Sequence, residues 1–370
     1  MNFIDLKRQY AEIKNEINEG INGVLEHGRY VLGPEIEELE QKLAAYTGVK
    51  HCVACASGTD ALLMPLMAWG IGSGDAVFTT PFTFIATAEV IKLVGAVPVF
   101  VDIDEKTYNI DPQKLDEAIE GVKADGKLNP KAIIPVDLFG MPADYEKIVP
   151  IAEKHNLILL EDAAQGFGGE LKGRKSGSWG NASATSFFPA KPLGCYGDGG
   201  AVFTNDDELD KLLRSIRMHG EGEERYDNVR IGLNGRLDSI QAAVLLAKLK
   251  IFDKEIELRN QVAAKYIKAL AGKVVTPHIP EGHTSCWAQF CVLAESAEHR
   301  SELQEKLRKK DIPTAIYYPK PLHLQDAFAE LGHKKGDFPV TDKIADRIFA
   351  LPMHPYLTDA EIDLIAETIG

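Results

Sequence analysis

The sequence predicts an α/β protein with a large domain built on a mostly parallel seven-stranded sheet and a smaller C-terminal α/β domain. Short apolar runs alternate with helical stretches between residues 50 and 205, which is typical of strands joined by crossover helices. Most of these runs are apolar along their whole length, as expected for strands that are buried on both faces. A chain of 370 residues is also long enough for about two domains.

The expected strands, in chain order, are residues 51–56, 76–80, 97–102, 131–137, 157–162, 184–188 and 200–205. A helical stretch follows from about Ser239, and it is long enough to lead from the large domain into the small one. We expect a large domain over residues 1–250, which includes an N-terminal helical segment, and a small domain over residues 251–370. Segments 121–130 and 220–229 are predicted to be surface loops.

The charge balance excludes one broad class of function. Lys and Arg number 41 and Asp and Glu number 55, so the formal net charge is −14, opposite to that of a typical nucleic-acid binder. The N-terminus is charged from Asp5 onward, and no window approaches the apolar length of a membrane span. We therefore expect a cytoplasmic protein with neither nucleic-acid nor membrane partners.

The five cysteines are too few and too scattered for a disulfide framework. Cys52 and Cys55 form a CxxC pair, but no second pair or nearby histidine completes a four-ligand zinc site. The apolar residues around the pair are typical of a buried strand. The sequence therefore predicts core cysteines and no metal.

Polar residues that follow the strands are the candidates for a ligand site, because ligands of open α/β sheets bind at the carboxyl ends of the strands. Ser57, Gly58 and Thr59 open an apolar helix whose backbone N–H groups could bind a phosphate, although an ordinary helix cap is the alternative. Asp162 ends an apolar strand, and a buried carboxylate needs a partner. A protonated ring nitrogen would serve.

Lys191 lies between two prolines in a glycine-rich loop after the strand at 184–188. A desolvated lysine is the usual nucleophile for a carbonyl carbon, and a surface lysine in a turn is the alternative. A phosphate-binding helix start, a strand-end acid and such a lysine are together what pyridoxal 5′-phosphate requires. Phe82 and Phe84 follow the second strand and could cover the cofactor ring, with core packing as the alternative.

Ten motifs in the same order make the chain resemble the DegT/StrS-type sugar aminotransferases over nearly its whole length. These are fold-type I pyridoxal phosphate enzymes that act on nucleotide-linked keto sugars. The motifs are FIDLKRQY, VLGPEIEELE, CASGTDAL, TPFTFIATAE, PVFVDID, EDAAQ, TSFFPAKPLGCYGDGG, RMHG, GLNGRLDSIQAA and LPMHPYL.

The resemblance implies a role for each matching residue. Lys191 would be the catalytic Schiff-base lysine, Asp162 would pair with the ring nitrogen, Gln165 would contact the side of the ring hydroxyl, and Phe84 would stack on the ring. Gly58, Thr59 and Ser186 would hold the phosphate. Asn234 would complete the phosphate site of the neighbouring subunit, which implies an obligate homodimer with two shared active sites. Arg236, Tyr318 and His354 would contact the sugar nucleotide or the amino donor. Relatives often have His-Tyr-Pro where this chain has Tyr317-Tyr318-Pro319, so the role of Tyr317 is open.

Within that family the chain is most similar to the branch that converts UDP-2-acetamido-2-deoxy-3-oxo-glucuronate to a 3-amino sugar for lipopolysaccharide or O-antigen, with L-glutamate as the expected donor. A dTDP-3-keto-6-deoxyhexose or a 4-keto sugar nucleotide is the alternative substrate. Arg217, Arg230 and Arg236 are expected to offset the repulsion between an acidic protein and a nucleotide diphosphate.

Three other functions fit the sequence less well. A nicotinamide dehydrogenase needs a GxGxxG turn, which Gly197 to Gly200 do not form. A related sugar dehydratase would have histidine in place of Lys191. A non-catalytic protein of the same fold would be expected to lack Lys191 or Asp162.

Overall fold

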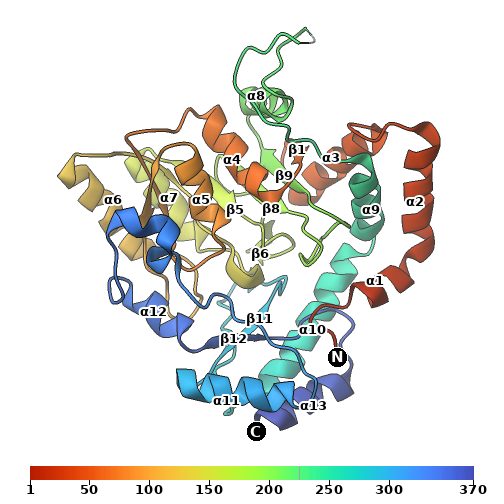
Figure 1. The fold of residues 1–370 in the computed structure, drawn as a ribbon, viewed down its shortest axis with the longest axis vertical. Helices are drawn as coiled ribbons and strands as arrows, with labels where there is room; N and C mark the ends of the chain where they lie inside the picture. Colours follow the sequence, from red (N-terminus) through yellow and green to blue (C-terminus); the bar gives the residue numbers. More distant parts are fainter. Residues whose placement is uncertain (225) are drawn as a thin grey trace.

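The computed structural model describes residues 1–224 and 226–370. A seven-stranded sheet forms its centre, with the strand order β1-β9-β8-β5-β4-β2-β3 (Figure 1). The strands are β1 (His51–Cys55), β2 (Asp75–Thr79), β3 (Val97–Phe100), β4 (Asn129–Ile133), β5 (Ile158–Asp162), β8 (Ala182–Ser186) and β9 (Gly200–Thr204). Each of the seven predicted strands is present, so the predicted fold class is confirmed. The predicted loop at 220–229 includes Arg225, which lies outside the described residues.

Strand β9 is antiparallel to its two neighbours, and the other neighbouring pairs are parallel. Parallel strands need a long crossover, usually through a helix, but no helix lies between β8 and β9. Gly200 at the start of β9 pairs with Cys55 of β1 on one side and with Ser186 of β8 on the other. The carboxyl ends of β1 and β8 therefore lie on either side of Gly200.

Helices cover both faces of the sheet, because successive strand residues point to opposite faces. Val53, Val77 and Leu160 pack on one face against helices that include α4 and α8, while Ala54 and Phe78 pack on the other. The helices of this part are α3 (Pro34–Thr47), α4 (Gly58–Ala68), α5 (Ala86–Leu93), α6 (Pro112–Asp125), α7 (Tyr145–His155), α8 (Asp207–Arg217) and α9 (Ser239–Leu249).

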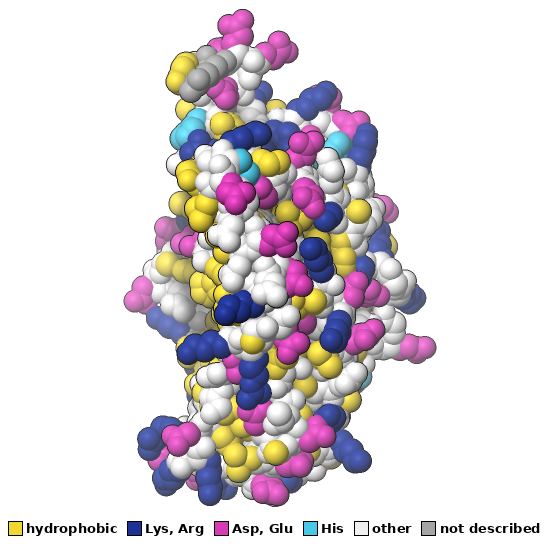
Figure 2. All heavy atoms as spheres, turned by 90° about the vertical axis from the view of Figure 1, so that its right-hand side faces the viewer, with side chains coloured by type: hydrophobic (Ala, Val, Ile, Leu, Met, Phe, Trp, Pro, Cys, Tyr) yellow, Lys and Arg dark blue, Asp and Glu magenta, His cyan; other side chains and the backbone are white. Residues whose placement is uncertain are grey.

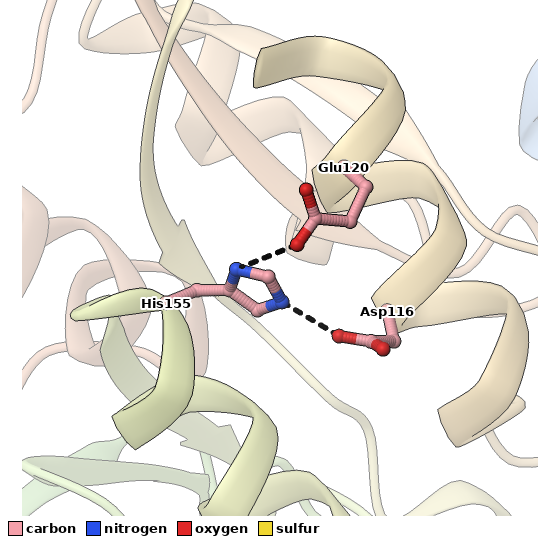
Figure 3. Close-up of side chains that lie close together, drawn as sticks. All are labelled: Asp116, Glu120 and His155. Carbon is pink, nitrogen blue, oxygen red and sulfur yellow. Dashed lines mark hydrogen bonds and ion pairs between the residues drawn. The ribbon is translucent and has the colours of Figure 1, made fainter. Parts of the chain in front are cut away.

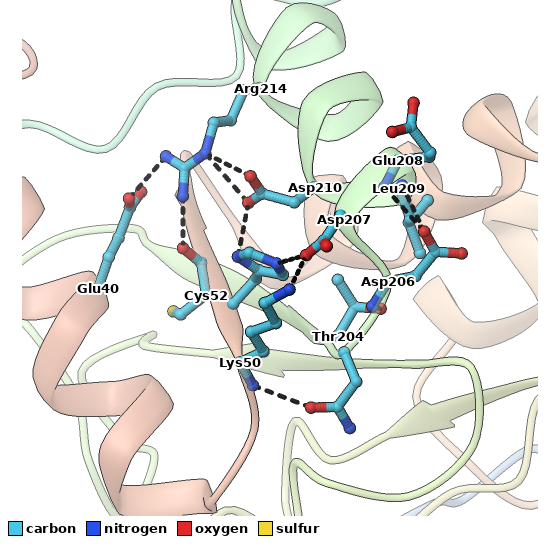
Figure 4. A network of polar contacts seen from close by, with 12 residues as sticks. Glu40, Lys50, Cys52, Thr204, Asp206, Asp207, Glu208, Leu209, Asp210 and Arg214 are labelled. Atoms are coloured by element: carbon cyan, nitrogen blue, oxygen red, sulfur yellow. Dashed lines mark hydrogen bonds and ion pairs between the residues drawn. The ribbon is translucent and has the colours of Figure 1, made fainter.

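A network of charged side chains ties α3 to β1 and α8 (Figure 4). Arg214 Nη1 lies 2.8 Å from Glu40 Oε2, and its Nη2 donates to Cys52 O over 3.2 Å. Arg217, one turn further on, donates to Glu40 Oε1 over 2.6 Å and to Ala54 O over 2.8 Å. These contacts fix the edge of the sheet from which helix α4 begins.

Two predicted segments differ from the structure. The helical stretch after Ser239 is two helices, because α9 ends at Leu249 and α10 (Phe252–Ala269) begins after a break. The predicted loop at 121–130 is mostly regular structure, because α6 extends to Asp125 and β4 begins at Asn129. Buried Leu115 and Ile119 anchor α6, which continues as a helix into this charged segment, and Gly126 ends the helix in the left-handed conformation with φ of 67°.

The C-terminal residues form a second apolar core, which includes Tyr266, Phe290, Leu303, Phe349 and Ile365. Its elements are α10, β11 (Phe290–Leu293), α11 (Ala297–Arg308), β12 (Ile348–Leu351) and α13 (Asp359–Ile369). Helix α12 (Pro339–Ala345) packs in a separate cluster, where Ile344 lies with Phe82 and Phe139. The break before α10 coincides with the predicted domain boundary at residue 250, and the division itself stays a prediction.

The N-terminal helices α1 (Leu6–Glu12) and α2 (Lys14–His27) follow the same side of the molecule (Figure 1). Phe3 O accepts a hydrogen bond from Met353 N over 3.1 Å, and Arg8 pairs with Glu361 at 3.2 Å. The start of the chain therefore packs on the C-terminal core. The remaining short strands are β6 (Glu170–Leu171), β7 (Arg174–Lys175) and β10 (His283–Thr284).

The surface agrees with the charge balance of the sequence. Acidic and basic side chains are interspersed over the face in Figure 2, and they form no continuous basic stripe there. Among residues 1–224 and 226–370, no helix is long and apolar enough to cross a membrane.

Candidate active site

The predicted phosphate site forms where β1 and β8 end. Ser57 caps helix α4 by accepting a hydrogen bond from Asp60 N over 3.0 Å, which leaves the backbone of Gly58 and Thr59 at the first turn. A Cβ atom on Gly58 would lie 2.6 Å from Ser186 Cβ. Glycine at this position therefore lets the helix start approach the Ser186 hydroxyl, and the structure brings all three predicted phosphate ligands together. Backbone N–H groups at a helix N-terminus with a hydroxyl beside them suit a phosphate.

Asp162 lies at the carboxyl end of β5 and is 4% exposed. Its Oδ2 accepts a hydrogen bond from Thr87 Oγ1 over 2.8 Å, and its Oδ1 accepts one from Ala164 N over 3.1 Å. Burial raises the pKa of Asp162 above its ordinary value, while these two donors and the charge of Lys191 oppose the rise. A cationic ring nitrogen would suit such a buried acid.

Lys191 lies in the loop between β8 and β9, where its backbone N–H donates to Phe188 O over 2.8 Å. Within the described residues its Nζ makes no hydrogen bond or ion pair. Burial lowers the pKa of Lys191, and the charge of Asp162 opposes this effect. The structure therefore places an unpartnered amine within electrostatic reach of the strand-end acid, as a Schiff-base lysine requires.

Gln165 and Tyr318 meet although they are far apart in the sequence. Gln165 Nε2 donates to Tyr318 OH over 3.1 Å, and Gln165 Oε1 accepts a hydrogen bond from Phe139 N over 3.0 Å. Because Gln165 follows Asp162 by three residues, Tyr318 is brought to the same end of the sheet. Phe82 packs edge-on against the Tyr318 ring with centroids 6.3 Å apart, so Phe82 is core packing.

Phe84 is 56% exposed, which is unusual for a large apolar side chain. Its carbonyl oxygen accepts a hydrogen bond from Thr87 N over 3.3 Å, and the Thr87 hydroxyl bonds to Asp162. Thr87 therefore links the ring predicted to cover the cofactor to the acid predicted to bind its nitrogen. We did not predict Thr87 from the sequence. The four-residue spacing of Thr83 and Thr87, whose hydroxyls lie 3.1 Å apart, was the available signal.

Two further buried acids adjoin this site. Asp137 accepts hydrogen bonds from Tyr145 OH (2.7 Å) and Ser176 Oγ (2.5 Å), and Glu161 accepts from Gly177 N and Trp179 N, both over 2.9 Å. Burial raises the pKa of Asp137 to about 6 and raises that of Glu161 well above its ordinary value. The bonds of Glu161 hold the end of β5, which carries Asp162.

Within residues 1–224 and 226–370, three of the predicted site residues form no hydrogen bond or ion pair with the site residues described above. Asn234 is exposed, and its backbone forms an isolated bridge with that of Met218. Arg236 is half-buried, and its Nε has no hydrogen-bond partner in the described structure. His354 is 2% exposed, and burial lowers its pKa to about 4, with a further contribution from the charge of Arg259.

The three arginines expected to offset a nucleotide's charge do not converge. Arg217 is buried and paired with Glu40, and it lines a cleft of about 540 Å³ between α3, β1 and α8. Arg230 is exposed and contacts Ser215 Oγ. Arg217 and Arg236 each have a buried Nε without a hydrogen-bond partner in the described structure, but the Arg217 guanidinium is already paired with Glu40, so Arg236 is the better candidate for a ligand.

One further cluster has ligand-type side chains. Asp116, Glu120 and His155 lie on α6 and α7, with their ligand atoms within 4.8 Å of one another (Figure 3). Lys154 Nζ lies 2.8 Å from both Asp116 oxygens, and Lys123 Nζ lies 2.5 Å from His155 Nδ1. Lysine ammonium groups already neutralise this cluster, so we assign no metal to it.

Comparison with known proteins agrees with this geometry. Residues 11–370 match the DegT/DnrJ/EryC1/StrS aminotransferase family. The chain is 49% identical over 368 residues to the UDP-2-acetamido-2-deoxy-3-oxo-D-glucuronate aminotransferase of Pseudomonas aeruginosa, covering 99% of both chains. It is 38% identical over 357 residues to the dTDP-3-amino-3,4,6-trideoxy-alpha-D-glucose transaminase of Streptomyces venezuelae, covering 96% of this chain and 91% of that one.

A solved structure of an aminotransferase of this family from Brucella abortus has the same fold. Its TM-score is 0.96 at 53% identity, and the match covers 100% of this chain and 98% of that one. The predicted cofactor fits the residues present, because a glycine-lined helix start, a buried acid and an unpartnered lysine occupy one end of the sheet. The family decides against a nicotinamide dehydrogenase. The chain belongs to the DegT/DnrJ/EryC1/StrS aminotransferase family and is a sugar aminotransferase that depends on pyridoxal 5′-phosphate.

Proposed function

We propose that this enzyme transfers the amino group of L-glutamate to UDP-2-acetamido-2-deoxy-3-oxo-glucuronate and so forms a 3-amino sugar for lipopolysaccharide, O-antigen or another surface glycan. The observation that carries the proposal is the 49% identity to the Pseudomonas aeruginosa enzyme over 99% of both chains. The Streptomyces venezuelae relative supports the alternative, a dTDP-linked 3-keto deoxyhexose, at lower identity.

Each step of the reaction has a residue suited to it. When bound, pyridoxal 5′-phosphate supplies an electron sink for the negative charge left on the donor's α-carbon. Lys191 would hold the cofactor before the donor binds, and once its amine is free it would move the proton at that carbon, because its lowered pKa favours the unprotonated amine that acts as a base. Asp162 would hold a proton at the ring nitrogen. Gly58, Thr59 and Ser186 bind the phosphate.

Arg236 is the candidate for reading the sugar carboxylate. A planar guanidinium binds a carboxylate through two parallel hydrogen bonds, and Arg236 Nε has no partner within the described residues. The alternative is that Arg236 binds the carboxylate of the glutamate donor or braces the dimer. Phe84, Gln165 and Tyr318 contribute the remaining contacts to cofactor and substrate in this proposal.

Steady-state kinetics with two sugar nucleotides tests the substrate. We expect kcat/KM to be higher for the UDP-linked 3-keto uronate than for a dTDP-linked 3-keto-6-deoxyhexose. Arg236→Ala should lower the value for the uronate alone, by roughly 30- to 150-fold, because one charge-assisted contact is worth about 2 to 3 kcal/mol. An equal loss on both sugars removes Arg236 as the reader of the carboxylate, and a preference for the deoxyhexose overturns the substrate.

The active species in this proposal is a homodimer with shared sites. Residues 220–224 and 226–232 project beyond α8 (Figure 1), and 85% of Ile231 and 55% of Val229 are exposed. Apolar side chains on a projecting segment favour burial against another chain. Asn234 lies just after this segment, where it could reach a partner.

Subunit mixing tests the shared site. Lys191→Ala and Asn234→Ala proteins should each be inactive, and mixing them should restore part of the activity, because one site of each hybrid dimer carries neither substitution. Hybrids that form without regaining activity contradict the shared site.

The proposal also includes a large domain over residues 1–250, a small domain over residues 251–370 and a cytoplasmic location. The five cysteines are free and buried, which suits a reducing compartment.

A further inference from the structure

The turn that carries Lys191 has a tightly fixed base. Lys191 N donates to Phe188 O over 2.8 Å, and Cys195 N donates to Phe187 O over 2.8 Å. A Cβ atom on Gly194 would lie 2.6 Å from the carbonyl oxygens of both Phe188 and Pro189. Because Gly194 packs so closely on the other arm of the turn, a shift of Gly194 would also move Lys191.

Lys248, on helix α9, contacts this base directly. Its Nζ donates a hydrogen bond to Gly194 O over 2.6 Å, and its side chain is 1% exposed. The Tyr196 ring covers the ammonium, with Nζ 4.4 Å from the ring centroid. The charge of Lys248 is therefore enclosed between the carbonyl of Gly194 and an aromatic ring, both of which belong to the loop that carries Lys191.

Helix α9 holds the same loop at a second point. Gln241 Oε1 accepts a hydrogen bond from Tyr196 N over 2.8 Å. Gln241 and Lys248 are seven residues apart, so they lie on one face of the helix. This face supports residues 194–196 through one side chain at each end.

A buried ammonium group is costly unless it is paired, and Lys248 has no carboxylate partner. Within the described chain Lys248 forms no ion pair. The carboxylate whose charge raises the pKa of Lys248 most is Glu255, but it is already engaged: it accepts hydrogen bonds from Gln9 Nε2 over 3.0 and 2.9 Å and from Tyr356 OH. Burial lowers the pKa of Lys248 to about 8. An apolar side chain would fill this space at a lower cost, so packing alone does not account for the lysine.

We propose that Lys248 is a positioning residue for the reaction: its ammonium fixes Gly194 O and thereby sets the place of Lys191 relative to Asp162. The inference deepens the proposed function and rests on the role of Lys191 as the cofactor-linked lysine. Lys248 itself reaches neither cofactor nor substrate in this proposal, and its effect passes through the backbone of the turn.

Three variants of the full-length enzyme test the proposal. Lys248→Met removes the donor with little change in length, Lys248→Arg keeps a cationic donor, and Lys250→Met is the matched control, because Lys250 is an exposed lysine two residues further along. The measurements are the melting temperature, the affinity for pyridoxal 5′-phosphate from the visible absorbance, the pH midpoint of that absorbance, and kcat and KM for glutamate.

We expect Lys248→Met to weaken cofactor affinity, shift the pH midpoint and lower kcat by about 10-fold or more, since small displacements of a catalytic group have effects of this order. Lys248→Arg should recover kcat to within about threefold of wild type, and Lys250→Met should match wild type. Lower melting temperature with unchanged absorbance, affinity and kcat in Lys248→Met overturns the proposal, as does an arginine variant no better than the methionine variant.

Two further measurements keep the result decisive. If Lys248→Met does not fold, Gln241→Ala removes the second support from a half-buried position, and it should show the same changes in absorbance and kcat to a smaller extent; wild-type values would then overturn the proposal.

Borohydride reduction of the wild-type enzyme tests the role of Lys191 separately. Cofactor fixed on another peptide contradicts the proposed function, whereas cofactor fixed on Lys191 with an unaffected Lys248→Met enzyme contradicts only the positioning role.

Discussion

The hydroxyl of Thr87 donates a hydrogen bond to the carboxylate of Asp162 over 2.8 Å, across 75 residues of sequence. Thr87 lies in the first turn of α5, and Asp162 ends β5. The bond favours the charged form of an acid whose pKa burial raises. Asp162 can therefore stay ionised in a buried place, which is what pairing with a protonated ring nitrogen requires.

Thr87→Val should lower kcat by at least about 10-fold, because it removes one hydrogen bond of about 1.5 kcal/mol or more from a buried charged carboxylate while keeping the shape of the side chain. Stopped-flow absorbance after mixing with glutamate measures the half-reaction directly. Thr83→Val is the control, because the Thr87–Asp162 bond remains, and we expect less than a twofold change. A Thr87→Val enzyme as fast as wild type would show that the bond does not support Asp162.

Gly58→Ala should prevent tight cofactor binding. The added Cβ would lie 2.6 Å from Ser186 Cβ, so the helix start must move away from the hydroxyl that completes the phosphate site. We expect at least a 10-fold rise in the dissociation constant for pyridoxal 5′-phosphate, on the order of the 1.4 kcal/mol that tenfold represents. Fluorescence titration of the apoenzyme measures it.

Gly121→Ala is the matched control for this substitution. Gly121 lies inside helix α6, and a Cβ atom there meets nothing within 4 Å. Alanine should leave cofactor affinity unchanged and stabilise the fold by about 0.5 to 1 kcal/mol. Equal cofactor affinity in the two alanine variants would contradict a phosphate site built on Gly58.

Arg217→Met should destabilise the protein by about 3 kcal/mol, because it leaves the buried Glu40 carboxylate without one of its two cationic partners. Urea unfolding followed by circular dichroism measures the change. Lys211→Met removes an exposed pair with Glu208, so it should change the free energy of unfolding by less than about 0.5 kcal/mol. Similar losses of unfolding free energy in both variants would show that the Glu40 network stabilises the sheet edge no more than an exposed ion pair does.

The sequence allows the strands and the main site residues to be predicted for physical reasons. A strand buried on both faces is apolar along most of its length, so β9 and the first part of β5 are visible in the sequence, and a strand-end acid such as Asp162 stands out against that background. Gly58 and Lys191 are visible because turn residues interrupt regular patterns. Each of these signals is local.

Contacts that depend on register or on tertiary packing are not visible in this way. The break after Leu249 interrupts a helical pattern that continues on both sides, so the sequence reads as one helix. From the sequence alone Lys248 looks like a surface lysine. It is buried because the loop that contains Gly194 folds back over it in the tertiary structure. The meeting of Thr87 with Asp162 likewise depends on which strands are neighbours, which no local pattern records.

The buried His354 should make the protein sensitive to acid. Burial lowers its pKa to about 4 from an ordinary value near 6.5, so the folded state holds the neutral ring while the unfolded state takes up a proton. The stability contributed by the neutral ring is therefore complete above pH 6.5 and is lost as the pH falls toward 4, by about 3 kcal/mol. His354→Asn keeps an acceptor for Tyr356 N, which lies 3.3 Å from His354 Nδ1, but cannot be protonated in this range. The melting temperature of wild type should thus fall more steeply than that of His354→Asn between pH 6.5 and 4.5.

His278→Asn, at an exposed position, serves as the control and should follow wild type throughout. Parallel curves for wild type and His354→Asn would show that other groups cause the acid sensitivity.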